Sequence, residues 1–479
     1  MPFQTIPLNV TGPSAEHRDS SLSSQFTQNF YPELLPGGKS EFTIQSWPGQ
    51  SLDGTTTGKD RGIWEMQNIG YRVAGTTLFE VSSDGTHTSR GTITGTGRCT
   101  FADDGTNMII CTDDGEQFQY TQSTQTLTTI TDSNIVGSTA VTFLNSKFIY
   151  TNVDLTSGID FVVSNVNDGT TASGLNAGAV EDDPGKLIHA YAFEDQIYMF
   201  TERTVPVYWN NGASRPPLDP VTGRVIEKVG LDALHSVANT DNFIYWLGDD
   251  KSVYQGVGGT GTPISTVPLA NAIENYAVTS DAVGYTLRIQ GQNFYILHFP
   301  TEGKTWGFSE GLGLDGWLNL SADTSRGPYN ATSHMFVYNK HLMADENSGD
   351  LYKLDINAFT NNTQTIQRIR TLASISGSII KQPGKRLEMS RFELIMKKGV
   401  GLISGQGEDP LIMIEYSVDG GDSFAPGTWA RVGRLGETVL KVEWWKMVSF
   451  YDLIIRLTTS DPVYYSIQQG SIDVRLAGW

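Results

Sequence analysis

The sequence predicts an all-β protein: a β-propeller of about seven blades, followed by a C-terminal β-sandwich. Turn residues recur at short intervals, and the apolar runs between them are strand-length and rich in Val, Ile, Tyr and Phe. Helix signals are sparse, and the best one predicts a short surface helix within 265–277, where Ser265 or Thr266 can cap. With 51 glycines and 18% charged residues, the 479-residue chain is globular and rich in turns rather than disordered.

Hairpin-like units recur along the chain, and their first residues are 36 to 51 positions apart. One hairpin per unit at this period is typical of a propeller with one four-stranded blade per unit. A series of β-sandwiches is the rival fold, and it would place turns every 8–12 residues or so without the longer repeat. The units occupy residues 71–85, 107–120, 147–164, 196–212, 242–256, 293–308 and 335–356.

The same pattern divides the chain into three parts. Residues 1–40 hold no clear strand and several turn residues, so we expect an extended N-terminal arm that packs on the propeller or on a neighbour. Residues 41–365 are expected to form the propeller. Beyond a polar stretch near 360–366 the strands become longer and alternate regularly, which predicts a separate β-sandwich over 366–479.

The charge distribution and the cysteine content limit the functions that the chain can have. Residues 366–479 hold 14 Lys+Arg against 12 Asp+Glu, whereas residues 1–365 hold 19 against 40, a net charge of −21. A surface that grips nucleic acid shows the opposite bias. The two cysteines, Cys99 and Cys111, could face each other across a hairpin, but two free thiols at neighbouring strand positions fit better. So few cysteines fit synthesis in a reducing cytoplasm.

The opening of the chain and its apolar runs carry no targeting signal that we recognise. The first residues lack the basic and apolar regions of a secretory signal. No apolar run approaches the roughly 18 residues that a membrane span needs. We therefore expect no membrane span.

The stretch YSVDGGDSF, residues 416–424, resembles the Asp-box of sialidases and related β-propeller glycosidases. Physically it is a hairpin tip: the two glycines permit positive φ, the carboxylate can accept nearby backbone N–H groups, and the aromatic ring packs beneath the turn. In families that carry Asp-boxes, these turns lie away from the active site. We therefore predict a structural turn made by Ser417, Asp419, Gly420, Gly421 and Phe424.

A search for a chemical site finds no zinc-protease, P-loop, nucleophile-elbow or paired-cysteine motif. The Gly-rich stretch 256–263 lacks the lysine and the helix of a P-loop, so we expect a loop. The acidic doublets sit beside glycine or at hairpin tips, where turn formation explains them better than calcium binding. The doublets are Asp103-Asp104, Asp113-Asp114 and Asp249-Asp250, and the dispersed histidines are His17, His87, His189, His235, His298, His334 and His341.

His334 and His341 are the closest pair of histidines in sequence, and we interpret them as strand residues rather than metal ligands. A glycosidase needs two neighbouring carboxylates, which the sequence cannot exclude because the pairing is spatial. A sialidase-like site also needs clustered arginines, and those before residue 366 are few and scattered. We therefore expect no enzymatic activity and no catalytic, metal-binding or cofactor-binding residues, while the residues that bind partners stay unknown.

Ordered segments across nearly the whole chain resemble the packaged-DNA stabilisation proteins of short-tailed bacteriophages, also described as tail accessory factors, hub or nozzle proteins. The N-terminal segments are QNFYPE (28–33), SWPG (46–49) and YRVAGTTLFEV (71–81). The later segments are EDQIYMFTERTVPVYWNNG (194–212), PLIMIEYSVDGGDSF (410–424) and VEWWKM (442–447).

The resemblance implies a structural virion protein of the phage tail, made in the host bacterial cytoplasm. Six copies would form a ring below the portal and its adaptor protein, extend the DNA exit channel and help to retain packaged DNA. A tail needle or plug and tailspike or fibre proteins would attach to the ring. Two alternatives remain open: a propeller-based carbohydrate-binding or glycan-cleaving tail fibre protein, and a cytoplasmic propeller scaffold unrelated to viruses.

In a tail ring, the acidic residues would have a physical role. DNA carries one negative charge per roughly 1.7 Å, so a basic lining would bind the duplex along its length and slow ejection. We hypothesise that much of the net −21 of residues 1–365 faces the lumen or its mouths, so that DNA passes without tight binding. The alternative explanation is ordinary solubility.

Overall fold

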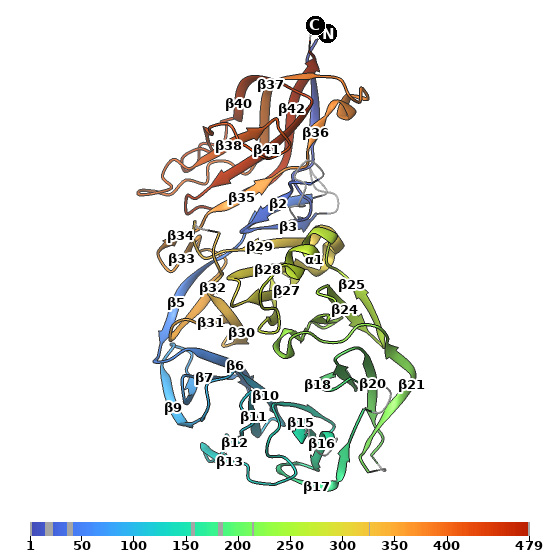
Figure 1. The fold of residues 1–479 in the computed structure, drawn as a ribbon. Coiled ribbons are helices and arrows are strands. Elements are labelled where there is room, and N and C mark those ends of the chain that lie inside the picture. The colour runs from blue at the N-terminus through green and yellow to red at the C-terminus, as the bar shows by residue number, and fades with distance from the viewer. Residues whose placement is uncertain are drawn as a thin grey trace.

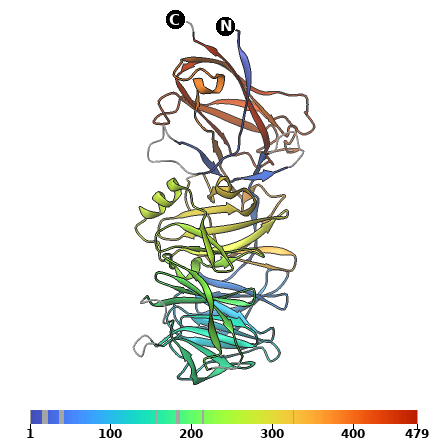
Figure 2. The same cartoon turned by 90° about the vertical axis from the view of Figure 1, so that its right-hand side faces the viewer.

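The computed structural model describes residues 2–14, 23–35, 42–154, 159–180, 185–212, 215–324 and 326–477. A β-propeller and a β-sandwich are stacked along the long axis of the molecule (Figure 1). Both chain ends lie at the tip of the sandwich, far from the propeller. Turned by 90°, the propeller is seen edge-on below the sandwich (Figure 2).

Seven four-stranded units form the propeller in the described part of the chain. Within each unit, neighbouring strands pair antiparallel, and the first strand borders the centre of the ring. Blade 1 comprises β6 (Asp60–Met66), β7 (Ile69–Ala74), β8 (Thr77–Val81) and β9 (His87–Thr92). Blade 2 comprises β10 (Cys99–Asp103), β11 (Asn107–Thr112), β12 (Gln117–Thr121) and β13 (Thr126–Thr129). Blade 3 comprises β14 (Ala140–Leu144), β15 (Lys147–Asp154), β16 (Ile159–Asn165) and β17 (Asp168–Gly178).

The next three blades follow the same order. Blade 4 comprises β18 (Leu187–Phe193), β19 (Gln196–Thr201), β20 (Val205–Asn210) and β21 (Leu218–Ile226). Blade 5 comprises β22 (Ala238–Asn239), β23 (Ile244–Leu247), β24 (Val253–Val257) and β25 (Thr260–Pro263). Blade 6 comprises β26 (Val283–Ile289), β27 (Gln292–Phe299), β28 (Lys304–Ser309) and β29 (Trp317–Leu320).

Blade 7 is completed by two distant parts of the chain. β30 (Ala331–Val337), β31 (Lys340–Asp345) and β32 (Asp350–Asp355) come from the end of the propeller segment, and β5 (Gly49–Thr55) comes from its beginning. β5 pairs with β32 antiparallel, so the first strand of the segment closes the ring. The short strand β33 (Thr360–Asn361) pairs with β5 and with β34 (Gln364–Thr365).

Each predicted hairpin falls within one blade, so the predicted β-propeller is confirmed. The hairpins were visible in the sequence because the central strands of a blade are buried on both faces and therefore read as apolar runs. An apolar cluster lies between each pair of neighbouring blades. Between blades 7 and 1, for example, Leu342 and Leu351 pack with Ile63 and Val81.

The predicted helix is α1 (Val267–Glu274), and Thr266 is its cap. The Thr266 hydroxyl accepts the Leu269 N–H at 3.4 Å. Leu269 and Ile273 are buried and join the cluster between blades 5 and 6. Three 3-10 segments, η1 (Leu234–Ser236), η2 (Glu310–Gly316) and η3 (Gly377–Ile380), complete the helical part of the described residues.

The sandwich is built from both ends of the chain. One sheet holds β1 (Gln4–Leu8), β3 (Phe30–Leu34), β4 (Phe42–Ser46), β42 (Ser466–Leu476), β37 (Leu387–Met396) and β40 (Val442–Phe450). The facing sheet holds β2 (Phe26–Gln28), β35 (Arg368–Thr371), β36 (Ile375–Ser376), β41 (Asp452–Thr459), β38 (Leu411–Ser417) and β39 (Thr428–Arg431). One apolar cluster between these sheets contains Phe30 and Ile44 together with Phe392 and Leu457.

The predicted extended arm over 1–40 is wrong where the structure describes it, because β1, β2 and β3 are strands of the sandwich. β1 pairs with β42, whose residues lie more than 450 positions further along the chain. Such pairing leaves little local signal, because these strands are short and two contain proline. The buried Arg370 also holds this segment, donating to the Val10 carbonyl at 2.7 Å and to the Thr27 hydroxyl at 2.7 Å.

Candidate functional site

The Asp-box-like turn lies in the loop between β38 and β39. Of these two strands, β39 was not predicted from the sequence. Asp419 accepts the Ser417 hydroxyl at 2.6 Å and the Ser423 N–H at 3.1 Å, and it also accepts the Ser423 hydroxyl. The Ser417 oxygen in turn accepts the Gly421 N–H at 2.9 Å. Gly420 and Gly421 both have positive φ, as the turn requires. These hydrogen bonds all run within the turn itself.

Two further features describe the chemistry of this turn. The hydroxyl of Ser417, followed by the Ser423 groups, holds the pKa of the Asp419 carboxyl well below its usual range. Phe424 packs against Arg456, whose guanidinium carbon lies 3.4 Å from the ring centroid. The Asp419 carboxylate therefore accepts hydrogen bonds from its own loop, and the Phe424 ring anchors that loop to β41.

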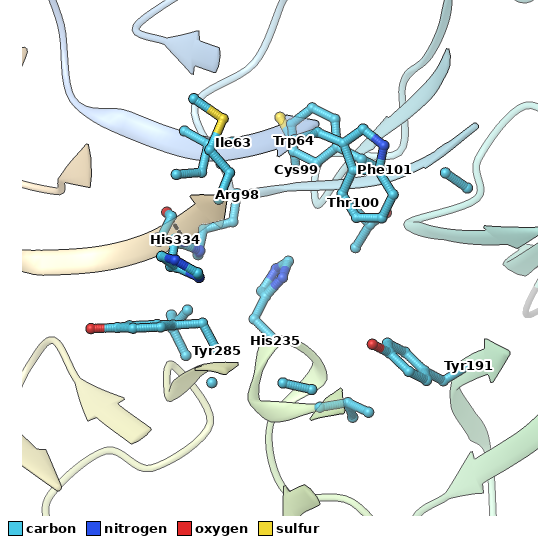
Figure 3. A pocket seen from close by; sticks show the side chains of 18 of the residues that line it. Ile63, Trp64, Arg98, Cys99, Thr100, Phe101, Tyr191, His235, Tyr285 and His334 are labelled. Carbon is cyan, nitrogen blue, oxygen red and sulfur yellow. Dashed lines mark hydrogen bonds between the residues drawn. The ribbon is translucent and has the colours of Figure 1, made fainter. Parts of the chain in front are cut away.

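The central channel of the propeller holds a cavity of about 640 Å³. Residues from the first strand of every blade line it, and Figure 3 shows side chains from several of these strands around the cavity. Trp64, Phe101 and Tyr191 contribute aromatic surface, while Arg98 and His235 contribute polar groups. Trp64 stacks on Phe101 and donates from Nε1 to Asp103 at 2.7 Å, so its orientation is fixed.

A hydrogen bond spans the channel between blades 2 and 5. His235, from η1 before blade 5, lies 2.9 Å through Nε2 from a carboxylate oxygen of Asp113 in the β11–β12 turn. Asp113 also accepts the backbone N–H of Arg98 at 3.1 Å. Arg98 itself reaches across to blade 7, donating to the Ser333 hydroxyl at 3.0 Å. The His235–Asp113 and Arg98–Ser333 links have no sequence signature, because each joins residues that are far apart along the chain.

The other histidines of the channel are neutral strand residues. Burial lowers the pKa of His189 to about 3, and its Nδ1 has no hydrogen-bond partner. Burial first, and then His341, lowers the pKa of His334 to about 3 as well. His334 Nε2 lies 2.9 Å from His341 Nδ1. Across the described ranges, no group of three or more His, Cys, Asp or Glu side chains is arranged to hold a metal ion.

The acidic doublets serve as turn acceptors, and this interpretation of them is confirmed. Asp114 accepts the backbone N–H groups of Thr96 and Gly97 at 2.8 and 3.1 Å, which lowers its pKa. Asp249 accepts the Gly230 N–H at 2.7 Å. Asp114 and Asp249 each lie in the turn between the two central strands of a blade and bind the loop that enters that blade, whereas Asp104 accepts the Thr106 N–H of its own turn at 2.7 Å. Part of the acidity of the propeller is therefore structural.

The two cysteines are buried and free, as expected. Cys99 lies opposite Thr112, and Cys111 lies opposite Thr100, so the thiols are not a cross-strand pair. Cys99 packs between blades 1 and 2, and Cys111 packs between blades 2 and 3. Burial raises the pKa of the Cys99 thiol to about 12.

Propeller and sandwich meet at a junction centred on Asn29. Its side chain donates to the carbonyls of Ser321 at 3.0 Å and Gln367 at 2.8 Å, and it accepts the Ser321 N–H at 3.0 Å. Its backbone N–H donates to Asn319 and its carbonyl accepts the Trp47 N–H. The segments 28–33 and 46–49, which carry part of the family resemblance, thus meet here.

A shared sheet makes the junction continuous. β2 pairs on one side with β35 of the sandwich and on the other with β29 of blade 6. The pair formed with β29 is parallel, at Gln28 and Asn319. Backbone hydrogen bonds therefore run from the propeller into the sandwich.

The sandwich and the propeller differ in net charge. Residues 1–48 and 366–479, which supply the sandwich, hold 16 Lys+Arg against 16 Asp+Glu and are neutral. Residues 49–365 hold 17 against 36 and carry the whole net charge of −19. No helix of the described residues has both the length and the apolar character to cross a membrane.

Comparisons with solved structures find distant likenesses, each with a TM-score below 0.5. A computationally designed protein, Ika8, is 14% identical, with 72% of this chain and 100% of that chain covered at a TM-score of 0.39. The WD40 propeller domain of Doa1 is 10% identical, with 64% and 96% covered at 0.41. The Pan2 WD40 domain of Neurospora crassa is 10% identical, with 64% and 94% covered at 0.39. Likeness at this level carries no argument about function.

A comparison with curated proteins finds no match. A family model for phage stabilisation proteins, described as bacteriophage P22 Gp10, β-propeller, matches residues 4–358. The match covers β1 to β4, the junction and the whole propeller, which is about three quarters of the chain. The chain therefore belongs to the phage stabilisation family described as bacteriophage P22 Gp10, β-propeller.

Proposed function

We propose that this phage structural protein is a tail hub or nozzle that extends the DNA exit channel below the portal and its adaptor protein. The observation that carries the proposal is the family match over residues 4–358, since that family supports a structural role in stabilising packaged DNA. The chain acts as a ring of copies, six in number, within the tail of the virion. It is made in the cytoplasm of the host bacterium.

The ring also anchors a needle or plug and the tailspike or fibre proteins. A rigid anchor needs its domains held in one orientation, and two observations support this property. β2 continues the sheet of blade 6 into the sandwich, and Asn29, which is 1% exposed, makes five hydrogen bonds, three of them with Asn319 and Ser321 of the propeller. Buried, fully bonded polar groups of this kind specify one arrangement of the parts that they join.

The role requires no catalysis, and we propose none. The passing duplex meets an acidic protein: residues 49–365 carry a net charge of −19, which supports the hypothesis that acidic residues face the lumen or its mouths. Turn formation accounts for some of these acids, as at Asp114 and Asp249. The remainder would repel DNA phosphates and keep the exit path free of tight contacts.

Particles assembled without this chain test the proposal. Heads should fill with DNA and then lose it, and supplying the intact chain in trans should restore both full heads and infectivity. The measurement is the fraction of DNA-filled heads in purified particles, with a strain lacking an unrelated fibre gene as the control. Particles that keep their DNA without the chain would contradict the proposed function.

A further inference from the structure

The central channel of the propeller has the size of a ligand-binding site. Its cavity of about 640 Å³ lies within the range of about 300–1,000 Å³ that is typical of sites for small ligands. The first strands of the blades build its wall, and each of them is fixed by pairing within its own blade. Sites on strands hold their side chains more precisely than sites on loops. The proposed tail role gives this cavity no task.

Aromatic side chains surround the cavity. Phe336 is 52% exposed although it lies on an inner strand of the propeller. Trp64, Phe143 and Tyr191 are half-buried, so these rings also keep surface that the blades do not cover. Exposed aromatic rings on the wall of a cavity offer flat apolar surface to a ligand. Six of the first strands each contribute one Phe, Tyr or Trp ring to the wall: Trp64, Phe101, Phe143, Tyr191, Tyr285 and Phe336.

The exposed rings are held in place by their neighbours. The Tyr191 hydroxyl donates to Asn239 Oδ1 at 2.8 Å. The Phe336 ring lies 4.8 Å from the His341 ring, measured between centroids. Trp64 is fixed by the hydrogen bond and the stacking contact described above. Side chains that are ordered before a ligand binds lose little conformational entropy on binding, which favours affinity.

Two polar side chains of the wall have hydrogen-bonding groups to spare. His189 is 5% exposed and neutral, and its Nδ1 has no hydrogen-bond partner among the described residues. Arg98 donates from Nη2 to the Ser333 hydroxyl at 3.0 Å and to the Thr332 carbonyl at 3.4 Å. Its Nε and Nη1 have no partner in the part of the chain that the structure describes. Because enclosed polar groups without partners are costly, a ligand that pairs with them gains stability.

The charges of the wall favour neither a nucleic acid nor a purely apolar ligand. Arg98 is the one Lys or Arg among the described residues that line the cavity, whereas a nucleic acid needs a basic surface. The lining acids already accept hydrogen bonds: Glu65 from the Asn68 N–H, and Asp103 from the Gly105 N–H at 2.9 Å and from Trp64. An apolar ligand would cover the free groups of Arg98 and His189 without pairing them.

A sugar has the chemistry that fits this wall. The C–H faces of its rings pack on aromatic side chains, and its hydroxyls both donate and accept, as the neutral imidazole of His189 does. We propose that the central channel binds an oligosaccharide, with its rings against the exposed aromatic side chains and its hydroxyls paired with His189 and Arg98. This inference goes beyond the proposed function, since a tail hub retains DNA whether or not its propellers bind a sugar.

Isothermal titration calorimetry with the purified full chain tests the binding. Two probes distinguish the source of the sugar: oligosaccharides released from the surface polysaccharide of the bacterium on which the phage grows, and the disaccharide unit of its peptidoglycan. Saturable binding of at least one probe is expected, and the probe that binds identifies the source. No binding of either probe at millimolar concentration would overturn the inference. It would leave the proposed function standing, because that function is tested separately by the DNA content of heads.

A matched pair of variants tests whether the sugar lies in the channel. Phe336→Ala should lower the affinity about ten-fold, as expected when a central aromatic contact is removed. Because Phe336 is already 52% exposed, the variant should fold, and an unchanged melting temperature checks this. Trp209→Ala is the control, since Trp209 is 46% exposed on β20 and does not line the cavity. Its affinity should equal that of the wild type. Equal affinities of both variants would contradict a sugar site in the channel.

Discussion

Asn29 and Ser321 form a reciprocal pair of hydrogen bonds across the junction between sandwich and propeller. The Asn29 side chain donates to the Ser321 carbonyl at 3.0 Å and accepts the Ser321 N–H at 3.0 Å. Asn29 has a φ of 53°, in the left-handed region where Asn is tolerated better than most residues. Both the side chain and the backbone conformation therefore suit asparagine at this position.

Asn29→Ala should destabilise the protein by about 2–4 kcal/mol, because buried partners lose their hydrogen bonds and the backbone becomes strained. Urea denaturation monitored by tryptophan fluorescence measures the change. Asn29→Gly relieves the strain but lacks the side chain, so the difference between the two variants isolates the backbone contribution. Wild-type stability in both variants would show that the junction does not depend on Asn29.

Gly349 should be essential for closing the ring. A Cβ at this position would lie 1.5 Å from the Thr56 carbonyl oxygen, in the seam where the Thr56 N–H donates to the Gly349 carbonyl at 2.8 Å. Gly349→Ala must therefore move β5 away from β32, which should lower the melting temperature by several degrees. Gly311→Ala is the control, since its Cβ would meet no atom within 4 Å. Equal melting temperatures for the two variants would contradict a tight seam.

Asp419→Ala should lower the stability of the sandwich, because three donors of the turn lose their acceptor. The folded pKa of Asp419 lies below that of an unfolded carboxyl, so its stabilisation is complete above about pH 4 and is lost as the pH falls further. Thermal melts of the full chain at pH 7 and pH 3 measure this. A deficit of the variant that is as large at pH 3 as at pH 7 would exclude a role for the charged carboxylate.

His189 should make the propeller sensitive to mild acid. Burial lowers its folded pKa to about 3, so the unfolded state binds a proton that the folded state excludes once the pH falls below about 6.5. Stability should therefore fall between pH 7 and pH 5, and it should fall less in His189→Phe. The denaturation midpoints of both proteins at the two pH values are the measurement. A parallel loss in the variant would assign the acid sensitivity to other groups.

A fragment of residues 366–479 should not fold by itself, although the sequence marks it as a separate domain. It lacks β1, β3 and β4 of one sheet and β2 of the other, together with core residues such as Phe30 and Ile44. Dispersed amide NMR signals from the fragment would contradict this expectation. Broad signals and dye binding typical of a loosely packed state would support it.

The parts of the fold that were predictable from the sequence are those whose signals are local. The central hairpin of each blade reads as two apolar runs around a turn, and the cap and buried face of α1 lie within a few residues of each other. Strand β5 and the N-terminal strands β1 and β2 could not be assigned, because their partners lie hundreds of residues away. Pairing over such distances depends on tertiary structure rather than on local propensity.

The candidate sites follow the same rule. Asp114 and Asp249 were recognisable as turn acids, since a short side chain beside glycine bonds nearby backbone N–H groups. The His235–Asp113 link across the channel joins residues 122 positions apart and has no sequence signature. For Asn29, the only sequence signal was its position in the segment QNFYPE. The role of this segment at the junction is visible only in the folded structure.

An image of the assembled tail would show directly whether this chain forms the proposed ring. At a resolution that separates the two parts of this chain, we expect six copies in a closed ring below the portal and adaptor. Each copy should show a seven-bladed disc joined to a sandwich. Copies placed on the capsid or at fibre tips, or a single copy in the tail, would contradict the proposed function.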